Sequence, residues 1–578
     1  MKPLSQKLQF LISAVLGVTA FAVPAQAIQM GSININQAIG ADAFYDIGIY
    51  GQGATVVNIE GGLPWAGHTA FSSNPVDEVY NGSYKALTTG NLTVHATTCS
   101  MLLAGEATVD TNEYWKGVAY EATLKAGNIA SSIAGSAFGF YDVDIWDTYT
   151  HFTISGADVI SSSYGGDYTA AAGSNQLINI INSVAARYTE TSIFFAAGNA
   201  YNAGTVGIPA VAHNVITVGA LDTTLYNRAS YSSYGPSDFY LPTSASTGTV
   251  IYDARASVDI VAPGTGITTT ATLNNPDGRA SGQGTSYATP ITAGGATLMA
   301  SLSRDLGWGE ESRDTRVIKA VLLNSASKSV NGWTNNTNPA ATVQTKDANG
   351  STVTFSNVAL TTQALDYEYG AGALDLGTTL KQYYSDTAYN PDNSSVKAGW
   401  TFGYVGKNTS CLANEIITVA ADTTFTVTLT WLADYLENDS VDSLSGTALA
   451  DLNLEVWKTD ELGNIDTLIA SSRTLYDSVE HLSLNITEEM YLRVRVLHDG
   501  MTYDLRTVPS VGENFGLAWS GASDVTLLPR GASSTPEPST YAFWAGTLAL
   551  ALTPIARRKK KTQRHRDAIS PAPQGNRR

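Results

Sequence analysis

Two different spacings of hydrophobic residues divide the chain. Up to about residue 385, short and largely apolar runs alternate with segments of helical period. Runs without a polar face are typical of parallel strands that are buried on both sides. We expect such strands at 54–59, 158–163, 192–197 and 214–219, and helices at 96–103 and 176–187. This order predicts an α/β fold with a parallel sheet covered by helices on both faces.

Beyond residue 386 the apolar residues alternate strictly with polar ones. The segments that show this pattern are 425–431, 452–457, 481–486, 491–496 and 515–519. A period of two places apolar side chains on one face of each strand, which is typical of an antiparallel β-sandwich. Asn, Pro, Asp and Ser cluster at 384–393 and mark the boundary. We therefore predict one domain over 28–385 and a β-sandwich domain over 386–530.

The N-terminus has the pattern of an export signal. Lys2 and Lys7 precede an apolar run at 10–23, and Ala25-Gln26-Ala27 follows with the small residues of a secretory cleavage site. We predict that residues 1–27 are a signal peptide. An N-terminal membrane anchor is the less favoured alternative, because the run is short for a membrane span.

The C-terminus carries a second targeting pattern. Pro536-Glu537-Pro538 precedes an apolar segment at 541–556 and a basic cluster at 557–561. This is the order of a short membrane segment with a positive stop on the cytoplasmic side. It resembles the PEP-CTERM sorting signal of Gram-negative bacteria, with a longer basic tail. The alternative is a plain C-terminal membrane anchor.

The resemblance implies a sorting segment over 531–578 whose apolar helix associates transiently with the membrane. It further implies recognition by an exosortase-type enzyme and removal of the tail. The expected location is outside the cytoplasm of a Gram-negative bacterium, at the cell surface, in the outer membrane or in the medium.

Composition limits the classes of binding partner and bears on the redox state of the two cysteines. The 578 residues carry a formal charge of −18, and positive charge is concentrated at the two ends. An acidic middle argues against a nucleic-acid partner and suits a solvated extracellular protein. Cys99 and Cys411 fall in different predicted domains. Two free thiols are favoured over one long-range disulfide.

Ser286 is the candidate nucleophile. It follows Gly284-Thr285 at the start of an expected buried helix, where the helix N-terminus favours developing negative charge. We expect Pro290 in the first turn of this helix, where a missing N–H costs little. Taken alone, a segment of this kind is more often an ordinary core helix capped by serine than a nucleophile.

Acyl transfer by a serine also needs a base, an orienting acid and oxyanion donors. His95 begins the expected helix at 96–103, Glu60 ends the strand at 54–59, and Asn199 follows the strand at 192–197. Strand ends are where open α/β folds place their sites. Each residue also has a plainer interpretation, as a core or capping histidine, a turn glutamate and an Asx turn.

Together these segments resemble the subtilisin-like serine peptidases, the subtilase family. Residues 284–290 match the family's Gly-Thr-Ser-x-Ala-x-Pro nucleophile motif, 196–199 its oxyanion-asparagine motif, and 163–165 its Ser-x-Gly strand. Further matches are 208–210, 214–220, 229–236, 259–264, 317–326 and 369–372. The resemblance covers about 35–385, and the order acid, histidine, serine also fits.

The resemblance implies a subtilisin-like fold and a serine endopeptidase that acts on protein or peptide substrates. Glu60, His95 and Ser286 would form the triad, and Asn199 would stabilise the oxyanion. Ser163 and Gly165 would pair with the substrate backbone as an added strand. The second domain resembles the jelly-roll or fibronectin-like modules that follow many subtilase domains.

Two motifs depart from the family pattern. The acid is normally Asp followed by Ser/Thr-Gly, whereas this chain has Glu60-Gly61-Gly62. The histidine motif is normally His-Gly-Thr-His-Val, whereas residues 95–99 place Ala96 and Thr98 at its second and fourth positions. His68 fits the family's structural histidine, and Asp77 is a fallback acid.

These departures keep other hypotheses open. A catalytically inactive subtilase-fold surface binding protein is the alternative, although the nucleophile, base and oxyanion positions are all filled. An esterase of the α/β-hydrolase type is disfavoured, because Ala288 stands where its Gly-x-Ser-x-Gly motif needs glycine. The sequence indicates no definite cofactor, and calcium as a structural ion stays open. Structural calcium is common in the family, but the acidic segment 437–442 lacks convincing ligand spacing, so no metal site is predicted.

Overall fold

The computed structural model describes residues 28–82, 89–109, 113–134, 137–166, 176–270, 273–347, 351–385, 398–435 and 446–527. The predicted signal peptide at 1–27, the sorting segment at 531–578 and the acidic segment 437–442 lie outside these ranges. Among the described helices, none combines the length and the apolar character that a membrane crossing requires.

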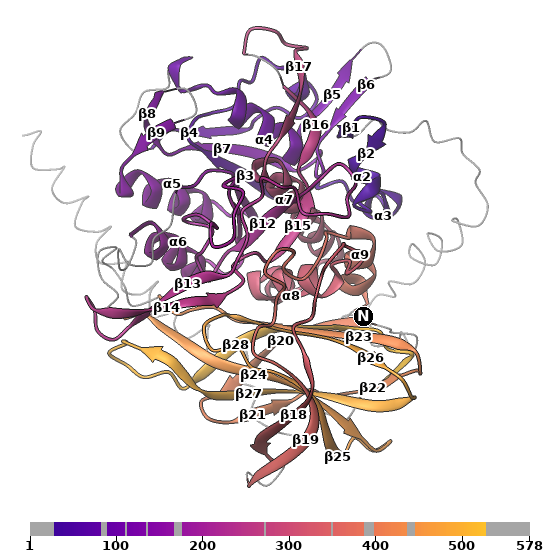
Figure 1. Cartoon of the computed structure of the whole chain (residues 1–578). Coiled ribbons are helices and arrows are strands. Elements are labelled where there is room, and N and C mark those ends of the chain that lie inside the picture. The colour runs from indigo at the N-terminus through magenta and orange to yellow at the C-terminus, as the bar shows by residue number, and fades with distance from the viewer. Residues whose placement is uncertain are drawn as a thin grey trace, which may run out of the picture. The chain divides into compact units, whose positions relative to one another are not determined.

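A seven-stranded parallel sheet forms the centre of the first domain (Figure 1). Its strand order is β15-β12-β11-β10-β3-β7-β4. The strands are β3 (Thr55–Glu60), β4 (Glu78–Tyr80), β7 (Thr123–Asn128), β10 (Val159–Ser162), β11 (Ser192–Ala196), β12 (Ile216–Leu221) and β15 (Ile260–Pro263). The four strands expected from apolar runs are β3, β10, β11 and β12, so the predicted parallel sheet is confirmed.

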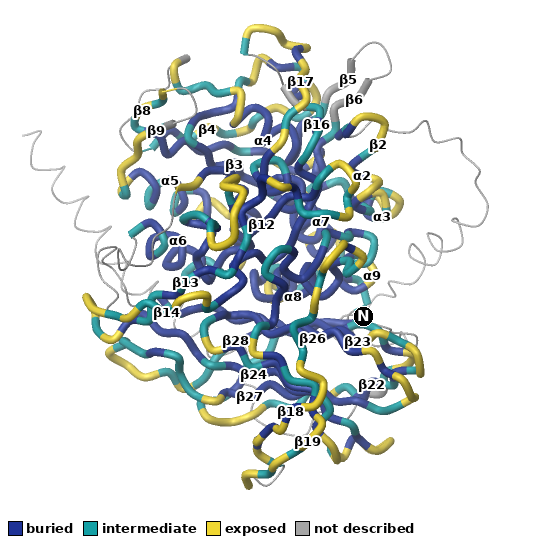
Figure 2. The backbone as a smooth tube through the Cα atoms, viewed as in Figure 1, coloured by how far each residue is buried: buried dark blue, intermediate teal, exposed yellow. Residues whose placement is uncertain are grey.

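Both faces of this sheet are buried against helices, which explains the apolar runs. Neighbouring residues of a strand point to opposite faces. Phe194 of β11 lies in one hydrophobic core with residues of α4 (Val94–Ala104) and α7 (Thr285–Leu306). Phe195 lies in the other core with residues of α5 (Asp142–Ile154) and α6 (Gln176–Arg187). The sheet strands accordingly run through the buried interior of the domain (Figure 2).

The remaining elements of the first domain lie around this sheet. They are α2 (Ile35–Ala38), α3 (Asp42–Asp46), α8 (Thr315–Ser325), α9 (Leu376–Tyr384), the sheet β17 (Arg279–Gln283)-β16 (Thr265–Thr270)-β1 (Gln29–Met30)-β2 (Ile33–Asn34), and the hairpins β5 (Glu106–Val109)-β6 (Glu113–Lys116), β8 (Ala130–Ala134)-β9 (Ala137–Phe140) and β13 (Ser237–Pro242)-β14 (Gly248–Arg255).

The position of Pro290 in α7 differs from the sequence-based expectation. The helix begins at Thr285, so Pro290 is its sixth residue and lies beyond the first turn. Proline lacks the N–H that would bond to the carbonyl four residues earlier, which is that of Ser286. The Ser286 carbonyl instead accepts hydrogen bonds from Ser163 Oγ at 3.0 Å and from the Cys99 thiol at 3.4 Å. The proline therefore frees an acceptor at the N-terminal end of α7.

Two further sheets form the C-terminal region. One has the order β20-β28-β23-β26, and the other β18-β19-β25-β24-β27-β22-β29 with β21 paired to β27. The strands are β18 (Asn338–Lys346), β19 (Thr352–Thr361), β20 (Ala398–Gly406), β21 (Ser410–Leu412), β22 (Glu415–Val419), β23 (Thr423–Thr430), β24 (Ala448–Thr459), β25 (Ile465–Ser472), β26 (Val479–Ile486), β27 (Met490–Asp504), β28 (Gly512–Ser520) and β29 (Asp524–Leu527). Phe425 of β23 and Leu454 of β24 share one core, as expected for the predicted β-sandwich.

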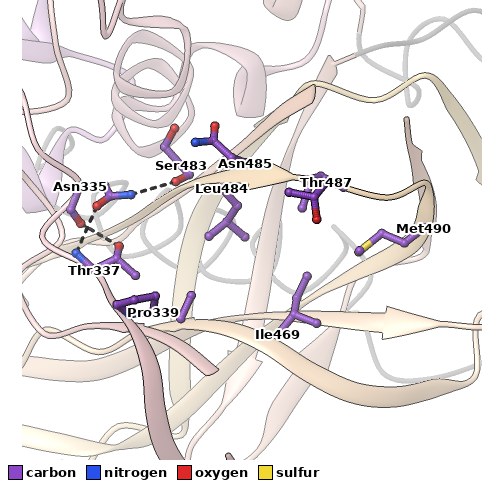
Figure 3. A pocket seen from close by; sticks show the side chains of 11 residues that line it. Asn335, Thr337, Pro339, Ile469, Ser483, Leu484, Asn485, Thr487 and Met490 are labelled. Carbon is purple, nitrogen blue, oxygen red and sulfur yellow. Dashed lines mark hydrogen bonds between the residues drawn. The ribbon is translucent and has the colours of Figure 1, made fainter. Parts of the chain in front are cut away.

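One hairpin joins this region from earlier in the chain than expected. β18 and β19 lie before residue 385, yet β19 pairs with β25. That pairing is parallel, whereas the other strand pairs of the two sheets are antiparallel among the described residues. Beside this hairpin, residues of β18, β19, β25, β26 and the start of β27 line a hollow of about 330 Å³ that includes Leu484 and Met490 (Figure 3). At its rim Asn335 Nδ2 donates to the Ser483 carbonyl at 3.2 Å and fixes the segment that leads into β18.

The polar positions of β23 are buried as well. Thr428 Oγ1 donates to Asn324 Oδ1 of α8 at 3.0 Å, and Thr430 Oγ1 donates to the Arg316 carbonyl of α8 at 2.6 Å. The threonines of the alternating pattern thus face helix α8 of the first domain. Hydrogen bonds to α8 satisfy these two buried hydroxyl groups.

Candidate active site

A cavity of about 470 Å³ opens where β3, β10 and β11 end. The residues that the sequence singled out all line it, namely Glu60, His95, Ser163, Gly165, Asn199 and Ser286. They come from distant parts of the chain, and the parallel strands bring their carboxyl ends to one edge of the sheet.

Glu60 and His95 form a pair at this edge. Glu60 is the last residue of β3, and His95 lies in the first turn of α4, which Thr93 caps by accepting from Ala96 N at 3.1 Å. His95 Nδ1 lies 3.3 Å from Glu60 Oε2. The other carboxylate oxygen, Oε1, accepts from the Ser163 N–H at 3.0 Å. One oxygen therefore anchors the carboxylate to β10 while the other reaches the imidazole, so the longer glutamate side chain is accommodated.

Two neighbouring groups act on the ionisation of His95. The Cys99 sulfur, 3.9 Å from Nδ1, and the Glu60 carboxylate raise the pKa of the imidazole above its ordinary value. Burial also raises the pKa of the Cys99 thiol.

Ser286 is held by two reciprocal hydrogen bonds with Ser163. The Ser286 hydroxyl donates to the Ser163 carbonyl at 3.3 Å, and the Ser163 hydroxyl donates to the Ser286 carbonyl at 3.0 Å. These bonds join the end of β10 to the first turn of α7. The second bond uses the carbonyl that Pro290 leaves free, so the proline contributes to placing the serine at the cavity.

Asn199 has a fixed orientation. Its side-chain oxygen accepts from the Thr285 backbone N–H at 3.0 Å and from Thr285 Oγ1 at 3.2 Å. Thr285 Oγ1 in turn accepts from the Gly198 N–H at 3.2 Å. An amide whose oxygen is used in this way presents its NH₂ group as the remaining donor. The arrangement supplies a hydrogen-bond donor to the cavity beside Ser286.

Residues 34–372 match the family model described as Subtilase family, Peptidase_S8. The chain belongs to the subtilase family. Its parallel sheet with flanking helices is the subtilisin-like fold.

Curated relatives of this subtilase are similar over part of their length. A thermophilic serine proteinase of Bacillus sp. (strain AK1) is 34% identical over 163 residues, which are 28% of this chain and 33% of the relative. Subtilisin-like protease 1 of Pseudogymnoascus destructans is 29% identical over 288 residues, which are 46% of this chain and 56% of the relative. The chain thus spans a third to about half of the length of these relatives. Among solved structures, the prenylagaramide maturation protease PagA aligns with a TM-score of 0.42 and 19% identity, over 60% of this chain and 98% of PagA.

Residues outside the motifs complete the cavity of this subtilase. Phe138 of β9 lines it. A Cβ atom added to Gly61 would lie 2.3 Å from Phe138 Cδ1, so the aromatic ring occupies the space that a serine or threonine would need. This contact gives a physical reason for glycine after the acid. No motif points to Phe138. The sequence shows only that a second aromatic residue, Phe140, lies two positions later.

The other candidates take structural positions. Asp77 is exposed and does not line the cavity. His68 is 2% exposed, accepts from the Ala70 N–H at 3.1 Å through Nδ1, and lies 3.3 Å from the Gly278 carbonyl through Nε2. Ala96 is buried away from the cavity. Cys99 and Cys411 are both free thiols.

Proposed function

We propose that this subtilase is a serine endopeptidase that hydrolyses peptide bonds of protein or peptide substrates. The observation that carries the proposal is the contact of Glu60 with His95 at 3.3 Å in the same cavity that holds the Ser286 hydroxyl and the Asn199 amide. A nucleophile, a base, an orienting acid and an oxyanion donor are the complete set that acyl transfer requires.

The reaction begins when substrate enters and the Ser286 hydroxyl leaves the Ser163 carbonyl for the His95 ring. His95 Nε2 takes the hydroxyl proton as Ser286 Oγ attacks the scissile carbonyl. Glu60 Oε2 accepts the Nδ1–H of His95, which keeps Nε2 free as the base and stabilises the imidazolium. His95 then gives the proton to the leaving amine, and a water molecule hydrolyses the acyl-enzyme by the same steps.

The substrate backbone is bound next to the nucleophile. Ser163 and Gly165 follow β10 and line the cavity. Their backbone groups would pair with an extended peptide as an additional strand. Such pairing aligns the scissile bond along the edge of the sheet, between the Ser286 hydroxyl and the Asn199 amide.

Replacing Asn199 with alanine is expected to lower kcat about 10²- to 10³-fold, the loss known for one oxyanion donor of subtilisin. The Asn199 NH₂ group and the Ser286 backbone N–H would share the oxyanion, so KM should change little. Steady-state kinetics on a peptide substrate measure both constants. A raised KM with unchanged kcat would instead assign Asn199 to substrate binding.

Hydrolysis of peptides by the purified full chain tests the proposed function. An internally quenched peptide library should be cleaved, and phenylmethylsulfonyl fluoride should stop the cleavage. A folded protein that cleaves no peptide would support the alternative function of a binding protein with a subtilase fold.

We also propose that the protein is exported and sorted by its terminal segments. The patterns at 1–27 and 536–561 support cleavage after Ala27 and processing by an exosortase-type enzyme at the cell envelope. We also propose a domain over 28–385 and a β-sandwich domain over 386–530, to whose sheet the earlier hairpin β18–β19 adds two strands. Protein recovered from a Gram-negative host should begin at Ile28, as N-terminal sequencing would show. A chain that retains Met1 would contradict export by cleavage.

A further inference from the structure

The side chains behind the catalytic histidine form a cluster of metal-binding groups. Glu60, His95 and Cys99 each offer one ligand atom, and these atoms all lie within 4.8 Å of one another. His95 Nδ1 is 3.3 Å from Glu60 Oε2 and 3.9 Å from Cys99 Sγ. The Cys99 thiol donates to the Ser286 carbonyl at 3.4 Å, but the proposed reaction uses no group of Cys99 although the thiol lies directly against the base.

Two of the three spacings among these ligand atoms are close to those around a zinc ion. Tetrahedral zinc with bonds of about 2.3 Å to sulfur and about 2.0–2.1 Å to nitrogen or oxygen holds neighbouring ligand atoms about 3.4 to 3.6 Å apart. The distances of 3.3 Å and 3.9 Å from His95 Nδ1 are close to this spacing. The third spacing, between the Glu60 carboxylate and Cys99 Sγ, is at most 4.8 Å, so these two side chains would close around the ion as it binds.

The charge and the softness of the ligands favour the same ion. Glu60 is 2% exposed and Cys99 is 0% exposed, so a charge placed here must be balanced. A carboxylate and a thiolate together carry two negative charges, which neutralise one Zn²⁺. Thiolate and imidazole suit Zn²⁺, whereas Ca²⁺ and Mg²⁺ prefer sites made of oxygen atoms.

We propose that Glu60, His95 and Cys99 bind Zn²⁺ and that the bound ion switches the peptidase off, an inference that rests on the proposed function. Binding forms bonds from Zn²⁺ to Glu60 Oε2, His95 Nδ1 and Cys99 Sγ. The thiol releases its proton to solvent, and the Nδ1 proton of the neutral imidazole moves through solvent to Nε2. Nothing is oxidised or reduced. The ion enters from the cavity past the His95 ring, whose side chain is 45% exposed.

Inhibition follows from the position of the His95 imidazole proton when Zn²⁺ is bound. In the metal-bound state Nε2 carries a proton and has no lone pair with which to accept the Ser286 hydroxyl proton. Glu60 is also withdrawn from its role in holding the imidazole. The ion therefore acts on the base and its partner without covering Ser286 itself.

Titration of the chelator-treated full chain with Co²⁺ and Zn²⁺ tests the site. Co²⁺ should produce the absorption band of a thiolate-to-cobalt charge transfer, and Zn²⁺ should displace it. In parallel, Zn²⁺ should abolish peptide hydrolysis, a chelator should restore it, and Mg²⁺ should have no effect. The optical readout needs no peptidase activity, so it tests the metal site even if the proposed function fails.

Two cysteine variants give a matched comparison. Cys99→Ser keeps a donor for the Ser286 carbonyl but removes the thiolate. It should weaken metal binding at least about 100-fold, because even outer partners of a metal ligand contribute 10- to 100-fold. The hydrolysis that remains in this variant should continue at Zn²⁺ concentrations that silence the unmodified chain. Cys99→Ala should behave alike, and Cys411→Ser, which changes the thiol on β21, should keep the original response.

The cobalt titration and the hydrolysis assay give different results if the proposed zinc site is present or absent. Loss of the cobalt band and of Zn²⁺ sensitivity in Cys99→Ser, with both retained in Cys411→Ser, supports the proposal. A folded, active chain that shows no cobalt–thiolate band and hydrolyses peptides undiminished in Zn²⁺ overturns it. Inhibition by Zn²⁺ that persists unchanged in Cys99→Ser also overturns it, because the ion would then act elsewhere.

Discussion

Ser286→Ala is expected to lower kcat about 10⁶-fold, the size of loss known for the corresponding change in subtilisin. The substitution removes the oxygen that attacks the substrate and leaves His95 without a proton to take. It also removes the hydroxyl that donates to the Ser163 carbonyl, but the Ser286 carbonyl keeps its bonds from Ser163 Oγ and Cys99. The first turn of α7 should therefore remain in place. Peptide hydrolysis under saturating substrate measures the effect.

Ser281→Ala is the matched control for this variant. Ser281 is exposed on β17, five residues before the nucleophile. Removal of its hydroxyl should leave hydrolysis and thermal unfolding unchanged. If Ser286→Ala hydrolysed peptides as fast as Ser281→Ala, Ser286 could not be the nucleophile.

Glu60→Gln is expected to lower kcat about 10⁴-fold, as when the triad aspartate of trypsin becomes asparagine. The geometry gives the reason. The Gln oxygen would keep the bond from the Ser163 N–H, which Glu60 Oε1 accepts at 3.0 Å. Its NH₂ group would then point at His95 Nδ1. The imidazole would have to accept there and carry its proton on Nε2, which is the wrong tautomer for a base.

Glu60→Asp separates charge from geometry. It retains the carboxylate and matches the usual acid of the family, so its loss of kcat should be far smaller than that of Glu60→Gln. The same kinetic assay compares the two variants. Full activity in Glu60→Gln would remove Glu60 from the mechanism. Equal losses of kcat in both variants would mean that the length of the side chain matters more than its charge.

The sheet and most of the candidate site could be predicted because their signals are local. Strands buried on both faces, such as β11, require apolar residues at nearly every position, and this requirement is visible in the sequence. The site residues follow strand ends or begin helices, where motifs of fixed spacing place them. The parallel sheet then brings Glu60 and Asn199 to one edge. Both positions could therefore be predicted without knowledge of contacts between distant segments.

The features that escaped prediction depend on contacts between distant segments. β18 and β19 show alternating burial, but only the pairing of β19 with β25 assigns them to the second region. The threonines of β23 look solvent-facing until α8 covers them. Cys99 lies against His95 because the two residues are four apart on α4, a spacing that is visible in the sequence. Its contact with the Ser286 carbonyl depends on how α4 packs against α7, which no local pattern of residues reports.

Covalent labelling of the purified full chain with a fluorophosphonate probe tests the central claim most directly. The probe reacts only with a serine whose hydroxyl is activated, and peptide mass mapping identifies the labelled residue. We expect one adduct, on Ser286, and its disappearance in His95→Ala. A folded chain in which Ser286 stays unlabelled, or is labelled equally well in His95→Ala, would contradict the proposal that this histidine activates this serine.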